Sequence, residues 1–147
     1  MKTMIKQLKA YRTMASTVHF TIPAKKEFVG LVRLAISGLA QSLPFDSDTI
    51  EDIKLVMSEV CTNMVLDSSV PGDPPVLTFS VSVSDDDITI DIDSTEAIGE
   101  LVSASSANWD GTSQSGYGMS IITALVDKVE LISNGDNHSI LRLKKLT

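Results

Sequence analysis

Residues 50–66 of this 147-residue chain read IEDIKLVMSEVCTNMVL and decide the fold around them. Apolar residues recur there at every third or fourth position, at Ile50, Ile53, Met57, Cys61 and Met64. This spacing lines one face of an α-helix, and Asp46 or Ser47 is available as its N-cap. We therefore expect a helix from about Ser47 to Ser68 with one face in a hydrophobic core.

Two polar residues, Glu59 and Asn63, lie one helical turn apart beside this apolar stripe. A carboxylate and a carboxamide next to a core are costly unless another group compensates for their burial. With Asp67 one turn further on, they could line a cleft that holds a cation or orients a reacting hydroxyl. The alternative is a solvated helix edge, and the pair alone does not decide between the two.

Similar patterns place the other elements. Alternating apolar residues predict strands at 17–23, 76–83, 88–93, 129–132 and 139–143. Helical spacing predicts helices at 25–42, at 47–68 and after Gly118; the first has an apolar stripe of Phe28, Leu31, Val32, Ala35, Ile36 and Leu39. This order predicts an α+β fold, a two-layer sandwich in which three helices cover one face of a mostly antiparallel mixed sheet.

The overall composition is typical of a soluble globular protein, with 43% hydrophobic and 21% charged residues. The net charge of −7 argues against direct binding to nucleic-acid phosphates. No apolar stretch is long enough to cross a membrane, and the chain starts without a secretory signal, so we expect a cytoplasmic protein. The single cysteine, Cys61, excludes an internal disulfide and is expected to be a core residue.

The first 15 residues differ from the rest because they are basic. Lys2, Lys6, Lys9 and Arg12 carry the charge of this segment, which has no acidic residue. We expect an N-terminal arm at 1–15, either mobile or docked on an acidic partner, and a single domain at 16–147.

A pair of glycines precedes the expected third helix. Gly116 and Gly118 flank Tyr117 at the end of a stretch, 94–115, that shows no sustained period. Glycines before a helix often serve only to make a tight turn. Free backbone N–H groups at a helix start also attract phosphate, and long loops in compact domains are usually functional or mobile. Together with the Glu59 and Asn63 helix, the pattern favours a nucleotide pocket.

Three segments in order resemble the GHKL ATPase superfamily, in its bacterial anti-sigma factor and serine kinase branch (RsbW-like). Residues 50–63 are similar to the asparagine box of that superfamily. Residues 22–34 are similar to the opening strand and first helix of the branch, and residues 115–130 to its second glycine box. The resemblance covers residues 17–146 and implies a GHKL (Bergerat) ATPase-like fold.

The resemblance also implies roles for individual residues. Asn63 would coordinate Mg²⁺ on the phosphates of ATP, and Glu59 would act as general base on a serine hydroxyl. Gly116, Tyr117 and Gly118 would bind the cofactor, with the two glycines cradling phosphate.

The adenine end of the implied site departs from the family pattern. The family has an aspartate, followed closely by glycine, that binds the adenine amino group; here residues 91–96 read DIDSTE. Asp93 is the candidate, but an ungapped match puts Ser94 at that position. A shift of one residue reverses the face of the strand, so Asp93 can serve only if the strand end bulges. Ser139 would supply the hydroxyl that the family places near adenine.

The implied function is that of an anti-sigma factor in a partner-switching system. It would sequester a sigma factor and phosphorylate a serine of an anti-anti-sigma (STAS-type) antagonist with ATP and Mg²⁺, as a homodimer. One alternative is a kinase-inactive binding module of the same fold, which the altered aspartate segment favours. Another is a small α+β domain without nucleotide, in which Glu59 and Asn63 satisfy each other or solvent.

Overall fold

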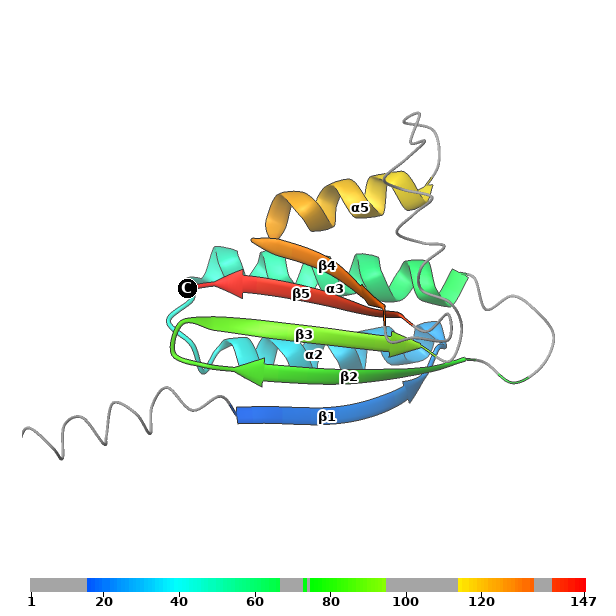
Figure 1. Cartoon of the computed structure of the whole chain (residues 1–147), viewed down its shortest axis with the longest axis horizontal. Coiled ribbons are helices and arrows are strands. Elements are labelled where there is room, and N and C mark those ends of the chain that lie inside the picture. Colours follow the sequence, from blue (N-terminus) through cyan, green and yellow to red (C-terminus); the bar gives the residue numbers. More distant parts are fainter. Residues whose placement is uncertain (1–15, 67–72, 74, 95–113, 134–138) are drawn as a thin grey trace, which may run out of the picture.

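The computed structural model describes residues 16–66, 73, 75–94, 114–133 and 139–147 (Figure 1). The predicted N-terminal arm and the position of Asp67 lie outside these ranges. In chain order the elements are β1 (Ser16–Pro23), the 3₁₀ turn η1 (Lys26–Phe28), α2 (Val29–Ala40), α3 (Ser47–Leu66), β2 (Val76–Val83), β3 (Asp87–Ser94), α5 (Gln114–Leu125), β4 (Lys128–Ser133) and β5 (Ser139–Leu146).

The predicted α+β class is confirmed. The five described strands form one sheet in the order β1-β2-β3-β5-β4, and each neighbouring pair is antiparallel. The sheet is thus antiparallel throughout its described part, not mixed. Because β5 inserts between β3 and β4, the last strand of the chain is an inner strand next to the edge strand β4, and helices α2 and α3 lie on one side of the sheet (Figure 1).

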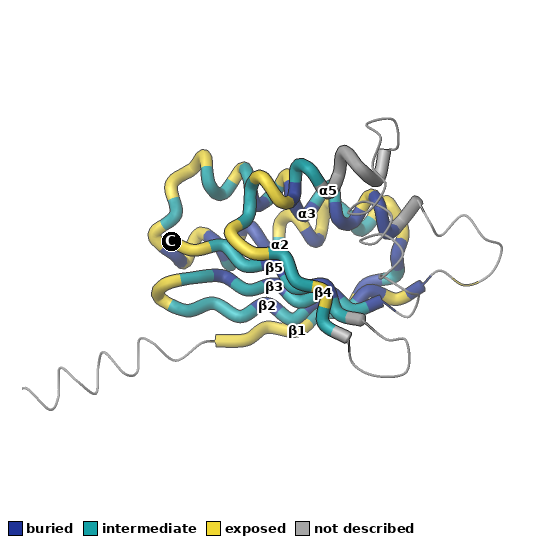
Figure 2. The backbone as a smooth tube through the Cα atoms, turned by 45° about the horizontal axis from the view of Figure 1, so that its top comes forward, coloured by how far each residue is buried: buried dark blue, intermediate teal, exposed yellow. Residues whose placement is uncertain are grey.

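Strict alternation along the strands explains why only one face of the sheet is covered. In β3, Ile88, Ile90 and Ile92 are buried, whereas Asp87, Thr89, Asp91 and Asp93 are only half-buried. The helix-facing residues of β2 are also apolar, and Phe79 stacks on Phe20 of β1 with ring centroids 4.9 Å apart. Figure 2 shows the buried positions gathered between the sheet and the helices.

Helix α3 supplies the largest part of the helical side of the core. Its buried apolar residues are Ile53, Val56, Met57, Val60, Cys61 and Met64. The helix begins after Asp46, whose Oδ1 accepts the backbone N–H of Thr49 at 2.7 Å; hydrogen bonding with the side chain of Thr49, and then with its backbone, lowers the pKa of the Asp46 carboxyl. Asp46 is therefore the N-cap. Burial raises the pKa of the Cys61 thiol to about 12, as expected for a core cysteine.

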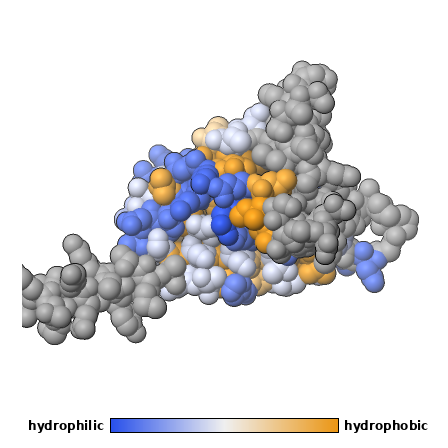
Figure 3. Space-filling view, viewed as in Figure 1, coloured by the Kyte–Doolittle hydropathy of each residue, from blue (hydrophilic) through white to orange (hydrophobic). Residues whose placement is uncertain are grey.

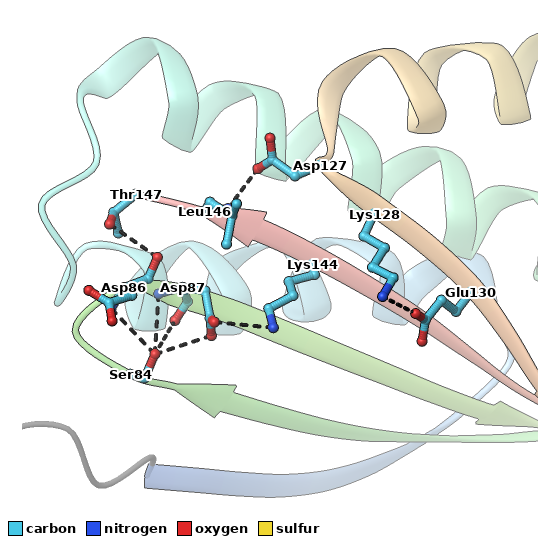
Figure 4. Close-up of polar contacts among 9 residues, drawn as sticks. All are labelled: Ser84, Asp86, Asp87, Asp127, Lys128, Glu130, Lys144, Leu146 and Thr147. Carbon is cyan, nitrogen blue, oxygen red and sulfur yellow. Dashed lines mark hydrogen bonds and ion pairs between the residues drawn. The ribbon is translucent and has the colours of Figure 1, made fainter.

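The uncovered face of the sheet is held by charged and polar pairs. Asp91 binds Arg142 through two bonds of 2.7 and 2.8 Å, which raise the pKa of that guanidinium. Lys144 lies 3.4 Å from Asp87, and Lys128 pairs with Glu130 (Figure 4). Hydrophilic residues consequently cover much of this face (Figure 3). These pairs are partly exposed, so each contributes little to stability.

The end of β5 is fixed by backbone hydrogen bonds to two turns. The N–H of Leu146 donates to Asp127 Oδ2 at 2.7 Å, and the N–H of Thr147 donates to the carbonyl of Asp86 at 2.8 Å (Figure 4). Both bonds lie at the end of the sheet opposite the finish of β3, so the polar groups considered next are at the other end (Figure 1). None of the helices in the described ranges combines the length and hydrophobicity that a membrane crossing needs.

Candidate functional site

Three chain segments end or begin at the same end of the sandwich. The carboxyl end of α3, the end of β3 at Ser94 and the start of α5 at Gln114 all lie on the same side of the molecule (Figure 1). Helix α3 also packs against α5. All of the candidate residues except Ser139, which begins β5, lie in or next to these three segments, and the structure brings the segments to one end.

Asn63 is the most unusual residue at this end. Its side chain is only 8% exposed, and its Nδ2 makes no hydrogen bond with any residue that the structure describes. Buried amide groups in native proteins almost always have a hydrogen-bond partner, because leaving one without a partner costs about 1–3 kcal/mol. An orphaned, buried donor at the edge of the core is suited to an acceptor that arrives with a ligand.

Glu59 lies one turn before Asn63 on α3 and is half-buried. Positions four residues apart share a helix face, so the two side chains are directed to the same side of α3. The unpartnered Nδ2 shows that Glu59 does not satisfy the buried amide. The solvated-edge interpretation is wrong for Asn63, because this residue is buried.

Gly116 and Tyr117 lie in the first turn of α5, which begins at Gln114, and Gly118 follows them in the helix. The sequence predicts the glycines ahead of the helix, so the helix starts earlier than expected. The earlier start leaves Gly116 among the residues whose backbone N–H groups lack an acceptor within the helix, whereas the N–H groups of Tyr117 and Gly118 are used by the helix itself. Free N–H groups and the helix dipole favour an anion at this end of α5.

The structure places Asp93 on the face of the sheet away from the helices. Ser94 pairs with Leu77 and Asp93 with Thr78, in a register that runs without a bulge through the end of β3. Asp93 therefore shares the outer face with Asp91, and the bulge needed to turn it inward is absent from this described strand pair. Ser94, which is 7% exposed, is the residue directed to the helix side. The Oδ1 atom of Asp93 is nonetheless buried.

Ser139, the other residue expected near the base, is the first residue of β5. It pairs with Ser133 of β4, while the next residue, Ile140, pairs with Asp93 of β3. Ser139 therefore lies on a strand adjacent to the end of β3, at the same end of the sheet as Ser94.

A second surface, on α2 and α3, was not foreseen from the sequence. Leu31 and Leu34 are 54% and 71% exposed, and the expectation that Leu31 packs in the core is wrong. Gly30, Arg33, Leu34 and Lys54 line an adjoining hollow of about 320 Å³. Leu31 and Val32 are consecutive in an apolar run; Val32 is fully buried in the core, whereas Leu31 faces outward.

Comparison with known proteins agrees with this architecture. Residues 22–145 match the family described as the histidine kinase-like ATPase domain. The chain is 36% identical to the serine-protein kinase RsbW of Halalkalibacterium halodurans, over 88% of this chain and 82% of that protein. It is 31% identical to RsbW of Bacillus velezensis, over 83% and 81% of the two chains.

A solved structure, that of a SiaB–SiaC complex from Pseudomonas aeruginosa, matches with a TM-score of 0.59 over 100% of this chain and 98% of that one. At 13% identity this match shows a common fold alone. The family match over residues 22–145 and the identity to two RsbW proteins over most of the chain show the family as well as the fold. The chain belongs to the histidine kinase-like ATPase family, in its RsbW-like branch.

Proposed function

We propose that this chain is an anti-sigma factor that also carries an ATP-dependent serine kinase site. It would sequester a sigma factor and phosphorylate a serine of a STAS-type anti-anti-sigma antagonist. The observation that carries the kinase proposal is the buried, unpartnered amide of Asn63 at the end of the molecule where α5 begins.

The donor groups at this end are chemically suited to a magnesium nucleotide. Asn63 offers an amide oxygen, a ligand type that Mg²⁺ accepts, and an N–H donor that suits a phosphate oxygen. Magnesium commonly takes only one or two protein ligands and fills its other positions with phosphate oxygens and water. The first turn of α5 would hold the phosphates through its backbone N–H groups. Asn63 would thus bind the metal and the α5 turn would bind the anion.

Glu59 is the proposed general base. Bound Mg-ATP supplies the γ-phosphoryl group, and the acceptor is the hydroxyl of a serine on the partner. Glu59 would take the proton of the serine hydroxyl while the serine oxygen forms the bond to the γ-phosphorus and ADP leaves. Its half-buried position on the same face as Asn63 keeps the carboxylate near the proposed metal site. In phosphoryl transfer most of the catalytic effect comes from positioning and charge stabilisation, which Asn63 and α5 would provide.

The exposed surface of α2 and α3 is the proposed docking site for the protein partners. Leu31 and Leu34 are unusually exposed, and the neighbouring Arg33 carries positive charge in a chain whose net charge is −7, while Lys54 pairs with Glu51. An amphipathic segment with acidic residues would match it. If the sigma factor and the antagonist use this one surface, binding of one excludes the other. The expected homodimer would use another surface, such as the exposed edge strand β1.

One observation favours the alternative of a kinase-inactive binding module. Asp93 faces away from the helices, so the carboxylate expected to read the base is not directed into the proposed site. The two functions differ in phosphate transfer to the antagonist, which is directly measurable.

Phosphate transfer from γ-labelled ATP to the antagonist protein tests the kinase proposal. Glu59→Ala should lower the transfer rate about 10²- to 10⁴-fold, the usual contribution of a general base, while the rise in melting temperature with Mg-ATP is retained. Asp48→Ala is the matched control, because Asp48 is an exposed carboxylate in the first turn of the same helix. Transfer by Glu59→Ala at the wild-type rate would rule out this role. Sigma binding without any transfer would establish the binding module.

A further inference from the structure

A hollow of about 170 Å³ lies on the uncovered face of the sheet, over β3, β5 and β4. It is lined by Thr89, Lys128, Glu130, Arg142 and Lys144. Thr89, Lys144 and Lys128 form one row across the three strands, and Arg142 and Glu130 belong to the next row on the same face. A single water needs only ~10–15 Å³ of such space, so the hollow has room for a larger ion.

Two lysines of this lining face each other across neighbouring strands. Lys128 of β4 lies directly opposite Lys144 of β5, and like charges at directly opposed positions destabilise a sheet. Their carboxylate partners lie on other sides: the Lys144 ammonium is 3.4 Å from Asp87 of β3, and Lys128 pairs with Glu130 of its own strand (Figure 4). Among the described residues, neither carboxylate forms an ion pair with both lysines. A ligand with several negative oxygens could bridge them.

Arg142 adds a third cation to the hollow. Asp91 accepts two of its N–H groups at 2.7 and 2.8 Å, which orients the guanidinium, and a guanidinium has five N–H donors in all. The three cations act together on Glu130. The pKa of that carboxyl is lowered first by its hydrogen bond with Lys128, and further by the charges of Lys128, Arg142 and Lys144. The lining of the hollow is therefore positive, in a chain whose net charge is −7.

We propose that this hollow binds a free, multiply charged oxyanion of the phosphate or diphosphate type, which bridges Lys128 and Lys144. Ammonium groups, a guanidinium and the Thr89 hydroxyl all donate hydrogen bonds, and charged donors of these kinds are the usual ligands of phosphate oxygens. A halide ion carries one charge and no separate oxygens, so it gains less from two ammonium groups. The hollow lies on the face of the sheet away from α3 and Asn63, so the inference does not depend on the proposed nucleotide site.

Titration calorimetry of the full chain with sodium diphosphate, without Mg²⁺ and at constant ionic strength, tests this inference. Lys128→Gln and Lys144→Gln should each raise the dissociation constant about 2- to 5-fold, the range for one partly exposed ion pair. Glu130→Gln should lower the dissociation constant, because a carboxylate that competes for the same cations disappears. Lys26→Gln, which removes an exposed lysine in η1, is the control and should leave the dissociation constant unchanged.

A variant on the helix side separates this hollow from the proposed nucleotide site. Asn63→Leu should bind diphosphate as the wild type does. Three results would overturn the inference: no diphosphate binding to the wild type at millimolar concentration, chloride binding as tight as that of diphosphate, or diphosphate binding that is lost in Asn63→Leu and unchanged in Lys128→Gln and Lys144→Gln. The nucleotide site is tested with Mg-ATP instead, so failure of one site does not decide the other.

Discussion

At the scale of single residues, Asn63 is where stability and the proposed function oppose each other. Replacing the orphaned amide by leucine, an apolar side chain of similar shape, should raise the free energy of unfolding by about 1–3 kcal/mol, because an unpaired buried donor disappears. Urea unfolding measures the change, and Thr62→Ala, at the exposed neighbouring position, is the control. A loss of more than about 1 kcal/mol in Asn63→Leu would mean that the amide is satisfied in the folded protein.

Cys61 gives a prediction about pH. Its pKa is raised by burial to about 12, so the folded protein keeps a proton that the unfolded chain releases near pH 9. The stabilisation from the neutral buried thiol is complete below pH 9 and is lost as pH rises toward 12. Unfolding free energies measured between pH 8 and pH 10 should therefore fall more steeply for the wild type than for Cys61→Ala. Equal slopes would show that the thiol titrates normally.

Asp93 and Ser94 show which features of single residues can be predicted from the sequence and which cannot. The alternation of β3 is visible in the letters DITIDIDS, and it correctly separates Ile92 from Asp93. Whether a bulge turns Asp93 inward depends on pairing with β2 and β5, which are distant in the chain. The unpartnered state of Asn63 likewise depends on every neighbour packed around it, so no local pattern could reveal it.

At the scale of elements, the helices and strands keep the periodic spacing of apolar residues seen in the sequence. The sequence predictions differ from the structure in which side of a helix faces the core and in where a helix begins. Helix α3 begins at Ser47 as expected, because Asp46 caps it. In α2, by contrast, the apolar residues are so dense that the sequence permits more than one choice of core-facing side, and Leu31 faces solvent instead of the core. Helix α5 begins two residues before Gly116, since glycine lowers helix stability without forbidding the conformation.

The exposed leucines of α2 carry a prediction about partner binding. Leu34→Glu should weaken binding of an acidic, amphipathic partner segment, because it removes apolar contact area and places like charges together. Folding should be almost unaffected, within about 0.5 kcal/mol, since Leu34 is 71% exposed. Gln41→Glu, at the exposed C-cap of the same helix, adds the same charge elsewhere and is the control. Undiminished binding of both the sigma factor and the antagonist by Leu34→Glu would place the docking surface elsewhere.

At the scale of the whole molecule, the two faces of the sheet have different roles. The helix side of the sheet forms the core, and the uncovered side carries paired charges (Figures 2 and 3). The overall architecture could be predicted because strands and helices are segregated in the sequence and keep distinct periods. The insertion of β5 between β3 and β4 could not, because it depends on long-range pairing.

The proposed partner switch makes a prediction for the assembled system. If both partners use the α2 and α3 surface, the sigma factor and the unphosphorylated antagonist should compete for the chain in size-exclusion experiments, without a ternary complex. Phosphorylation of the antagonist serine should return the chain to the sigma factor, because the modified partner gains negative charge at its contact and loses affinity. A stable complex of all three proteins would contradict a shared surface.

The most direct test of the central claim, that Asn63 and the first turn of α5 form a magnesium-nucleotide site, is thermal unfolding of the wild type and Asn63→Leu with and without Mg-ATP. At ~100 times the dissociation constant, a ligand that binds only the folded state adds about 2.7 kcal/mol to stability. We predict a clear rise in melting temperature for the wild type and none for Asn63→Leu. An unchanged wild-type melting temperature at millimolar Mg-ATP, or an equal rise in both proteins, would contradict the claim.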